Sequence, residues 1–403
     1  MAKLILFSIF FFTLFARRFF AKIEFFSNIY IYELFFCFLF ILLLSQVKFE
    51  KKILFKKIPL RYLLLIVLAG YCFSLAIFKC LSLITDSVSL NLASDGLREV
   101  VILFYPIYFV ILLVYFFTLN KTSLIKFNNY VNISIFVFPI FCSFLYFTKY
   151  FYVIIDENGN SLWPNNNFIL VSVLLALFHY QKKFTFSYYA FSIFQALTSM
   201  LFEAQRGILV ILLASYAILI RKLNHLKIVF FLFGTSFILI FLFGSYFSPR
   251  FSHNPSNFVT STFSLPSTSS SSSSDIRYSS TETRIEMWKS VLSKVNENTT
   301  IFFIGMPLHQ KIISNHPWAY PHNGYLSAIA RGGILTLFCY LLFLLDSIFA
   351  LQYTKTDKIF SISHYVYFGA CIDAFTQTVF DSPYSLILLM FSAALSITIR
   401  MRI

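Results

Sequence analysis

Long apolar segments follow one another along almost the whole chain, with short polar connections between them. A helix that crosses a membrane needs about 20 apolar residues, whereas a membrane-barrel strand needs about 10 in an alternating pattern. The segments here have about 15 to 23 residues, which fits helices. We place about twelve of them, at 4–20, 29–46, 61–83, 99–118, 129–148, 167–180, 184–202, 207–220, 228–246, 331–351, 359–377 and 385–400. Only 12% of the residues are charged, about half the share in soluble domains, so the sequence predicts an all-α integral membrane protein.

Lysines and arginines orient this bundle. The net charge of +15 comes largely from short basic clusters between the apolar segments, and such clusters face the cytoplasm in membrane proteins. We therefore expect membrane lipids and no nucleic acid as partners. From the second segment onward, every second connection then faces outward and both termini are cytoplasmic. Arg17, Arg18 and Lys22 break this alternation, so the first segment either crosses the membrane or lies at its surface.

One outward connection is much longer than the others and divides the chain. We predict a bundle of about nine helices over 1–246, a large outer loop over 247–330 and about three further helices over 331–403. Serine, threonine and proline dominate the first part of the loop, which has little to bury.

The second part of this loop contains an amphipathic stretch. Its apolar residues recur at helical spacing over 282–294, which predicts a short helix lying on the membrane surface; they are Ile285, Trp288, Val291 and Leu292.

Three outward-facing residues stand out as candidates for chemistry. Arg206 opens an apolar segment, where a charge near the hydrocarbon is costly and indicates a functional partner. Arg284 lies in the first turn of the amphipathic stretch, and its guanidinium group suits phosphate oxygens. His322 precedes the next helix, and imidazole transfers protons near neutral pH. Each also has a structural interpretation: Arg206 reaching lipid headgroups or Glu203, Arg284 pairing with nearby acids, and His322 holding a hydrogen bond. No histidine or carboxylate spacing in the outer connections fits a metal site, and no cofactor motif is present.

These residues lie in motifs that resemble the O-antigen ligase and O-antigen polymerase superfamily of bacterial envelope glycan enzymes. The motifs are Gln205-Arg206-Gly207, Thr283-Arg284-Ile285-Glu286-Met287-Trp288, Pro321-His322-Asn323-Gly324-Tyr325-Leu326 and Arg331-Gly332-Gly333-Ile334-Leu335. Trp163-Pro164-Asn165-Asn166 is a weaker match. The resemblance is sharp over residues 200 to 340.

The resemblance implies a metal-independent glycosyl transfer at the periplasmic face of the bacterial inner membrane, with 247–330 as a periplasmic loop. The donor would be a glycan on undecaprenyl pyrophosphate. By analogy, Arg206 and Arg284 would bind the pyrophosphate and His322 would act as the base towards the acceptor hydroxyl. Further candidates are Arg98 for phosphate or lipid contact, and Glu203, Gln205, Asn323 and Arg331 as assisting residues.

The acceptor separates two enzymes within this superfamily. A ligase would use a sugar of lipid A-core, and a polymerase would use a second lipid-linked repeat unit. One dominant outer loop late in the chain, the length and the basic charge favour the ligase. A transporter of lipid-linked sugars is a third interpretation, although no charged residues recur deep within several helices as a polar pathway would require.

Overall fold

The part of the chain described by the structure, a computed structural model, is almost entirely helical, in agreement with the predicted fold class. The described residues are 2–11, 13, 24–26, 29–46, 59–85, 100–147, 168–169, 172–173, 175–176, 280–308, 323–353, 360–375, 380 and 383–402. The apolar segments predicted at 184–202, 207–220 and 228–246 lie outside them, as does most of the long loop, so the total of about twelve spans stays a prediction.

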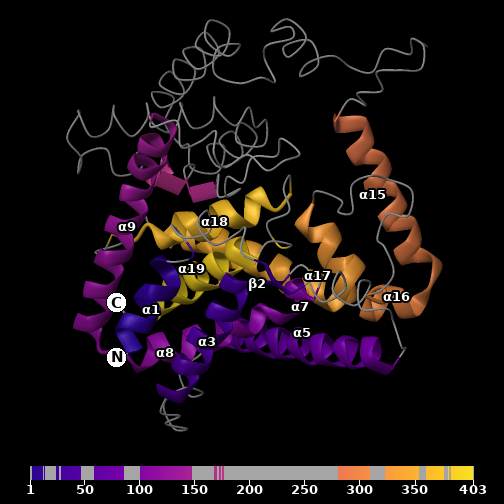
Figure 1. The fold of residues 1–403 in the computed structure, drawn as a ribbon, viewed down its shortest axis with the longest axis horizontal. Helices are drawn as coiled ribbons and strands as arrows, with labels where there is room; N and C mark the ends of the chain where they lie inside the picture. Colours follow the sequence, from indigo (N-terminus) through magenta and orange to yellow (C-terminus); the bar gives the residue numbers. More distant parts are fainter. Residues whose placement is uncertain are drawn as a thin grey trace, which may run out of the picture.

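The described elements follow the chain in the order drawn in Figure 1. The helices are α1 (Ala2–Phe11), α3 (Ile31–Gln46), α5 (Leu60–Thr85), α7 (Val101–Phe104), α8 (Pro106–Thr118), α9 (Lys121–Phe147), α15 (Ser280–Glu297), α16 (Thr299–Ile304), α17 (Gly324–Tyr353), α18 (Ser363–Asp373) and α19 (Pro383–Arg402). Two short strands, β1 (Glu24–Phe26) and β2 (Ile29–Tyr30), pair antiparallel. This small hairpin differs from the all-α prediction, and it is formed largely by aromatic and β-branched residues, which favour strands.

Four helical stretches in the described part of the chain are long and apolar enough to cross a membrane. They are Leu60–Ser82, Val101–Thr118, Gly324–Leu351 and Ser385–Arg402, and each matches a predicted segment. The second is interrupted at Tyr105, where α7 ends and α8 begins with Pro106. Proline suits the first position of a helix because it has no N–H group to leave unsatisfied there.

Helices α5 and α17 lie side by side and run antiparallel. The Arg61 guanidinium lies 5.8 Å from the ring centre of Phe349, and near the other end of α5 the Lys79 ammonium donates a 2.6 Å hydrogen bond to the Arg331 carbonyl. Figure 1 shows α5 along the lower edge of the molecule with α7 and α17 next to it.

One end of this bundle is held by a cluster that we call the clasp, formed by Arg61, Tyr62, Asp346 and Arg400. Arg400 and Asp346 form a buried ion pair at 2.5 Å, and Arg61 Nη2 donates a 2.7 Å hydrogen bond to the Tyr62 hydroxyl. Nearby, Arg402 Nη1 donates to the carbonyl of Phe117 at 2.7 Å. The clasp therefore gathers helix ends that the predicted alternation places on one side of the membrane.

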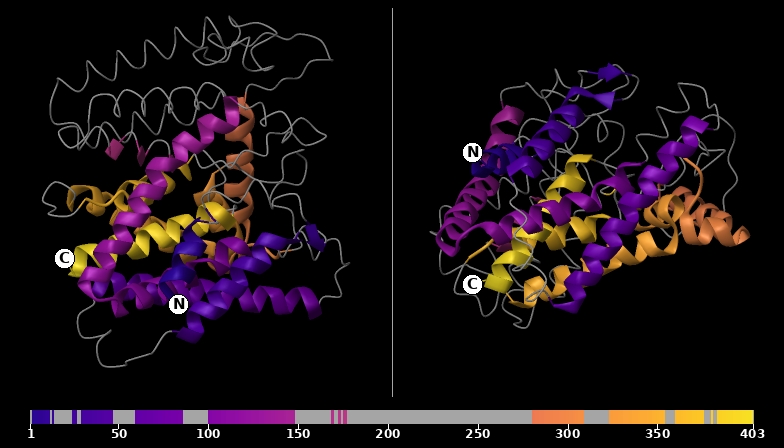
Figure 2. Two further views of the ribbon diagram at one scale, coloured as in Figure 1. Left: turned by 60° about the vertical axis from the view of Figure 1, so that its left-hand side comes forward. Right: turned by 90° about the horizontal axis from the view of Figure 1, so that it is seen from below.

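The opposite end of the bundle carries α15 and α16, which together we call the platform. In Figure 1 and in the left panel of Figure 2, α15 runs across the direction of α5 and stands beside α16 and α17. Such an arrangement lets α15 pack its apolar stripe on the start of α17.

Candidate active site

Helix α15 confirms the predicted amphipathic helix and corrects which side chains it buries. Met287, Val291 and Val295 are buried, whereas Ile285 and Leu292 are exposed. The buried residues recur every four positions, so they form one stripe. They pack against three buried residues from α17 and from the segment after α16, namely Met306, Ile329 and Ala330. These six residues form an apolar cluster separate from the main core.

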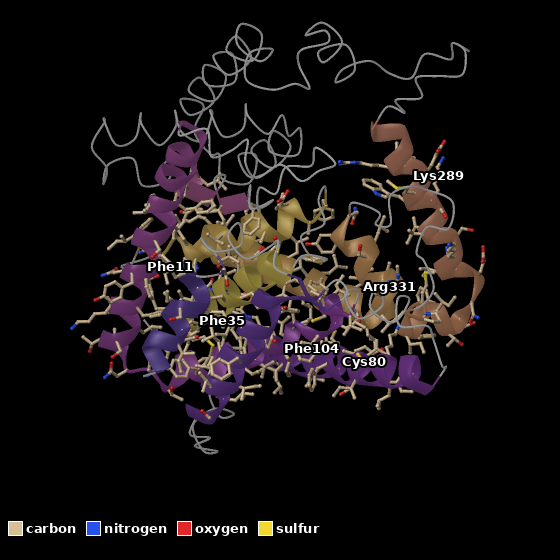
Figure 3. All side chains as sticks on the ribbon, viewed as in Figure 1. Phe11, Phe35, Cys80, Phe104, Lys289 and Arg331 are labelled. Atoms are coloured by element: carbon tan, nitrogen blue, oxygen red, sulfur yellow. The ribbon has the colours of Figure 1, made fainter. Side chains whose placement is uncertain are left out.

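Arg284 lies on this same stripe, one turn before Met287, and is half-buried. Trp288, from the next turn, is partly buried against the cluster, as is Leu326 from the first turn of α17. The platform thus directs the Arg284 side of α15 towards the start of α17. Figure 3 shows Lys289, which is exposed, on the other side of α15.

The start of α17 is fixed by the side chain of Asn323. Its Oδ1 accepts hydrogen bonds from the backbone N–H groups of Tyr325 and Leu326, at 3.0 and 3.1 Å, as a helix N-cap does. Its Nδ2 donates to the Phe375 carbonyl at 3.1 Å, beyond the end of α18. Because of this cap, α17 begins at Gly324, ahead of the start predicted at residue 331. Asn323 therefore has a structural role next to His322 in the chain.

Helix α17 is broken at Gly333, whose φ of 70° and ψ of −170° are not helical. Residues 303–307, which end α16 and follow it, pack into the break. Met306 N–H donates a 2.6 Å hydrogen bond to the Ala330 carbonyl. A Cβ atom on Gly333 would lie 2.7 Å from Ile304 N and closer still to the Phe303 carbonyl. Only glycine permits this approach of two backbones. We call this contact the α16–α17 joint.

Arg331 is the buried side chain of the joint, with only 1% of its surface exposed. Its Nη1 donates a 2.9 Å hydrogen bond to the Pro307 carbonyl, and Figure 3 shows it where α17 meets the platform. The structure therefore gives Arg331 a function in joining α16 to α17.

The described residues include three of the eight candidates, namely Arg284, Asn323 and Arg331. They come from neighbouring elements, because α15, α16 and α17 pack on one another. The other five, which are Arg98, Glu203, Gln205, Arg206 and His322, lie outside the described residues. That they share a site with Arg284 stays a prediction.

Lys79 also belongs to this region, although no motif in the sequence singles it out. It lies in an apolar helix, is 4% exposed and donates hydrogen bonds to the carbonyls of Met306 and Arg331. The signal was available, because a charged residue inside a membrane segment is costly and calls for a function. Within the described ranges, no three histidine, cysteine, aspartate or glutamate side chains gather as a metal site would require.

These features define a helical membrane protein with a platform packed on a broken helix at one end of its bundle. Residues 190–341 match the family model described as O-antigen ligase, and this match confirms the resemblance to the O-antigen ligase superfamily. The matched segment contains Arg206, Arg284 and His322. A search of curated proteins finds no match to the chain.

The family match carries a broad function. It indicates a membrane glycosyltransferase-like enzyme of the ligase or polymerase type, linked to lipopolysaccharide synthesis and acting on lipid-linked glycans.

Proposed function

We propose that the protein is an O-antigen ligase, which transfers a glycan from undecaprenyl pyrophosphate to a sugar hydroxyl of lipid A-core. The observation that carries the proposal is the family segment at 190–341, within which α15 turns its Arg284 side towards the start of α17. The motif residue His322 directly precedes the capping residue of that helix.

The reaction sequence follows from the charges that develop. His322 takes the proton of the acceptor hydroxyl, whose oxygen forms a bond to the anomeric carbon of the donor. The bond from that carbon to the phosphate oxygen breaks, and undecaprenyl pyrophosphate leaves with the electron pair. Arg206 and Arg284 stabilise the negative charge on the leaving group, as fixed cations do in many enzymes. No metal ion takes part in this proposal.

The charge distribution supports a periplasmic site. Arg400 and Arg402 lie in the last turn of α19, at the clasp end of the bundle, and the basic connection before α5 leads to the same end. Basic ends of this kind face the cytoplasm. The platform is at the opposite end of α5 and α17, so in this proposal Arg284 faces the periplasm.

A gel of surface lipopolysaccharide from a strain that lacks the gene tests the proposal. Loss of all polymer from lipid A-core, with long lipid-linked chains accumulating, is the result expected for the ligase. Core that carries one repeat unit would identify the polymerase instead, and unchanged chains would refute both.

Variants of the three motif residues then test the mechanism in the same strain. We expect Arg284→Ala and Arg206→Ala to lower transfer by about 10²- to 10³-fold, as does loss of a group that stabilises transition-state charge. His322→Ala should lower it by about 10²- to 10⁴-fold. Lys289→Ala, which removes an exposed cation from the other side of α15, is the matched control. Normal product from the His322 variant would rule out the base.

A further inference from the structure

The break in α17 leaves backbone carbonyls without their helical hydrogen-bond partners in an apolar environment. In a regular helix each carbonyl accepts from the N–H group four residues later, and a break removes such partners from the carbonyls just before it. A backbone group without a partner is costly in a membrane. At the α16–α17 joint, the carbonyls concerned are those of Ala330, Arg331 and Gly332. The Gly332 carbonyl accepts a 2.9 Å hydrogen bond from the Thr336 hydroxyl of α17 itself.

The carbonyls of Ala330 and Arg331 have partners from other elements. Met306 N–H donates to the Ala330 carbonyl. The Lys79 ammonium of α5 donates to the Arg331 carbonyl at 2.6 Å and also to the Met306 carbonyl at 2.7 Å. One side chain therefore ties α5, the segment after α16 and the break in α17 to a single point.

The Nζ atom of Lys79 is bound by backbone carbonyls. Among the residues that the structure describes, no carboxylate forms an ion pair with it; the ion pair of Arg400 with Asp346 is at the clasp, near the other end of α5. The neighbouring side chain is that of Arg331, another cation, which itself donates to the Pro307 carbonyl. Retaining a lysine here is expensive, which indicates a task that an apolar side chain would not perform.

We propose that Lys79 is a positioning residue for glycan transfer. By holding the α16–α17 joint, it fixes the platform, and with it Arg284, relative to the first turn of α17 that follows His322. This inference rests on the proposed function. The substrate contacts would come from Arg284 and His322, while Lys79 would set the positions of these two residues relative to each other.

The test compares Lys79→Met with Lys79→Arg, which keeps the charge and the N–H donors, and with Lys289→Met as the control cation. Transfer is measured as kcat per folded protein molecule, with purified protein and lipid-linked donor. The state of the joint is measured separately by Met306→Cys in a background without the native cysteines, as the rate of labelling by a membrane-impermeant maleimide. Residue 306 is fully buried in the structure.

With Lys79→Met we expect the thiol introduced at position 306 to be labelled about tenfold faster, because the joint opens locally. We expect kcat to fall by about 10²-fold, the typical effect of misplaced catalytic groups. Lys79→Arg should restore both values in large part, and Lys289→Met should change neither. A merely structural role would reduce the amount of folded protein and leave kcat per folded molecule unchanged.

Two results would overturn the inference: a normal kcat in Lys79→Met, or a low kcat with residue 306 still protected, which would mean that Lys79 acts on substrate directly. If Lys79→Met does not fold, Gly305→Ala disturbs the joint from the other side, because its Cβ would lie 2.5 Å from the Arg331 carbonyl oxygen. A normal kcat in Gly305→Ala, once maleimide labelling shows the joint open, would equally refute it.

The inference and the proposed function can fail separately. Full transfer by Arg284→Ala and His322→Ala would refute the proposed mechanism, whatever Lys79 does. Loss of transfer in those two variants together with normal transfer in Lys79→Met would refute only the positioning by Lys79.

Discussion

Replacing Gly333 with alanine tests the α16–α17 joint at its tightest point. Gly333 has a φ of 70° and ψ of −170°, a conformation essentially confined to glycine, and forcing another residue into it costs about 1–3 kcal/mol. The added Cβ would also meet the backbone of Phe303 and Ile304, and such overpacking costs about 1–3 kcal/mol more. Gly333→Ala should therefore reduce the free energy of unfolding by about 2–6 kcal/mol.

Gly70→Ala is the matched control, because Gly70 lies in α5 and a Cβ there meets no atom within 4 Å. Alanine within a helix is more favourable than glycine by about 0.5–1 kcal/mol, so this variant should be neutral or slightly stabilised. The measurement is the melting temperature of the purified protein in detergent. At about 2 °C per kcal/mol, Gly333→Ala should melt at least about 4 °C below the unmodified protein. Equal melting temperatures for the two variants would refute the close approach of α16 to the break.

Three further predictions concern the cap, the clasp and the chemistry. Asn323→Ala should destabilise the protein by about 0.5–2 kcal/mol through loss of the N-cap, and Asn323→Asp, which keeps the acceptor, should lose less; equal melting temperatures would contradict the cap. Asp346→Leu should destabilise by about 3–5 kcal/mol because it leaves the buried Arg400 without its ion-pair partner, and adding Arg400→Leu should recover most of that loss; a double variant as unstable as the single one would contradict this. Transfer should persist in excess EDTA, and a loss that only a divalent ion restores would overturn the metal-free mechanism.

The helical class and several elements could be predicted because they depend on local pattern. The apolar segment at 61–83 matches the Leu60–Ser82 span, and the segment at 385–400 matches Ser385–Arg402. The amphipathic stretch predicted α15 because its apolar residues repeat at the helical period. Length and periodicity are properties of the sequence itself.

The buried face of α15 and the partners of Lys79 depend on tertiary packing, so the sequence alone could not predict them. Ile285 and Leu292 are as apolar as Val291, yet only Val291 is buried, because α16 and the start of α17 cover one stripe of α15. The function of Lys79 likewise depends on carbonyls more than 220 residues away in the chain, at Met306 and Arg331. Nothing near Lys79 in the sequence indicates those partners.

The two ends of the bundle respond differently to change in the sequence. The clasp joins side chains, so the loss of one partner can be repaired by a second substitution at the other position. The α16–α17 joint brings backbone against backbone at Gly333, and no residue is smaller than glycine. A substitution of Gly333 therefore cannot be compensated by a second substitution nearby, because only a shift of α16 as a whole would make room for the added side chain. Genetic screens for restored function should therefore recover paired changes at the clasp and only true reversion at Gly333.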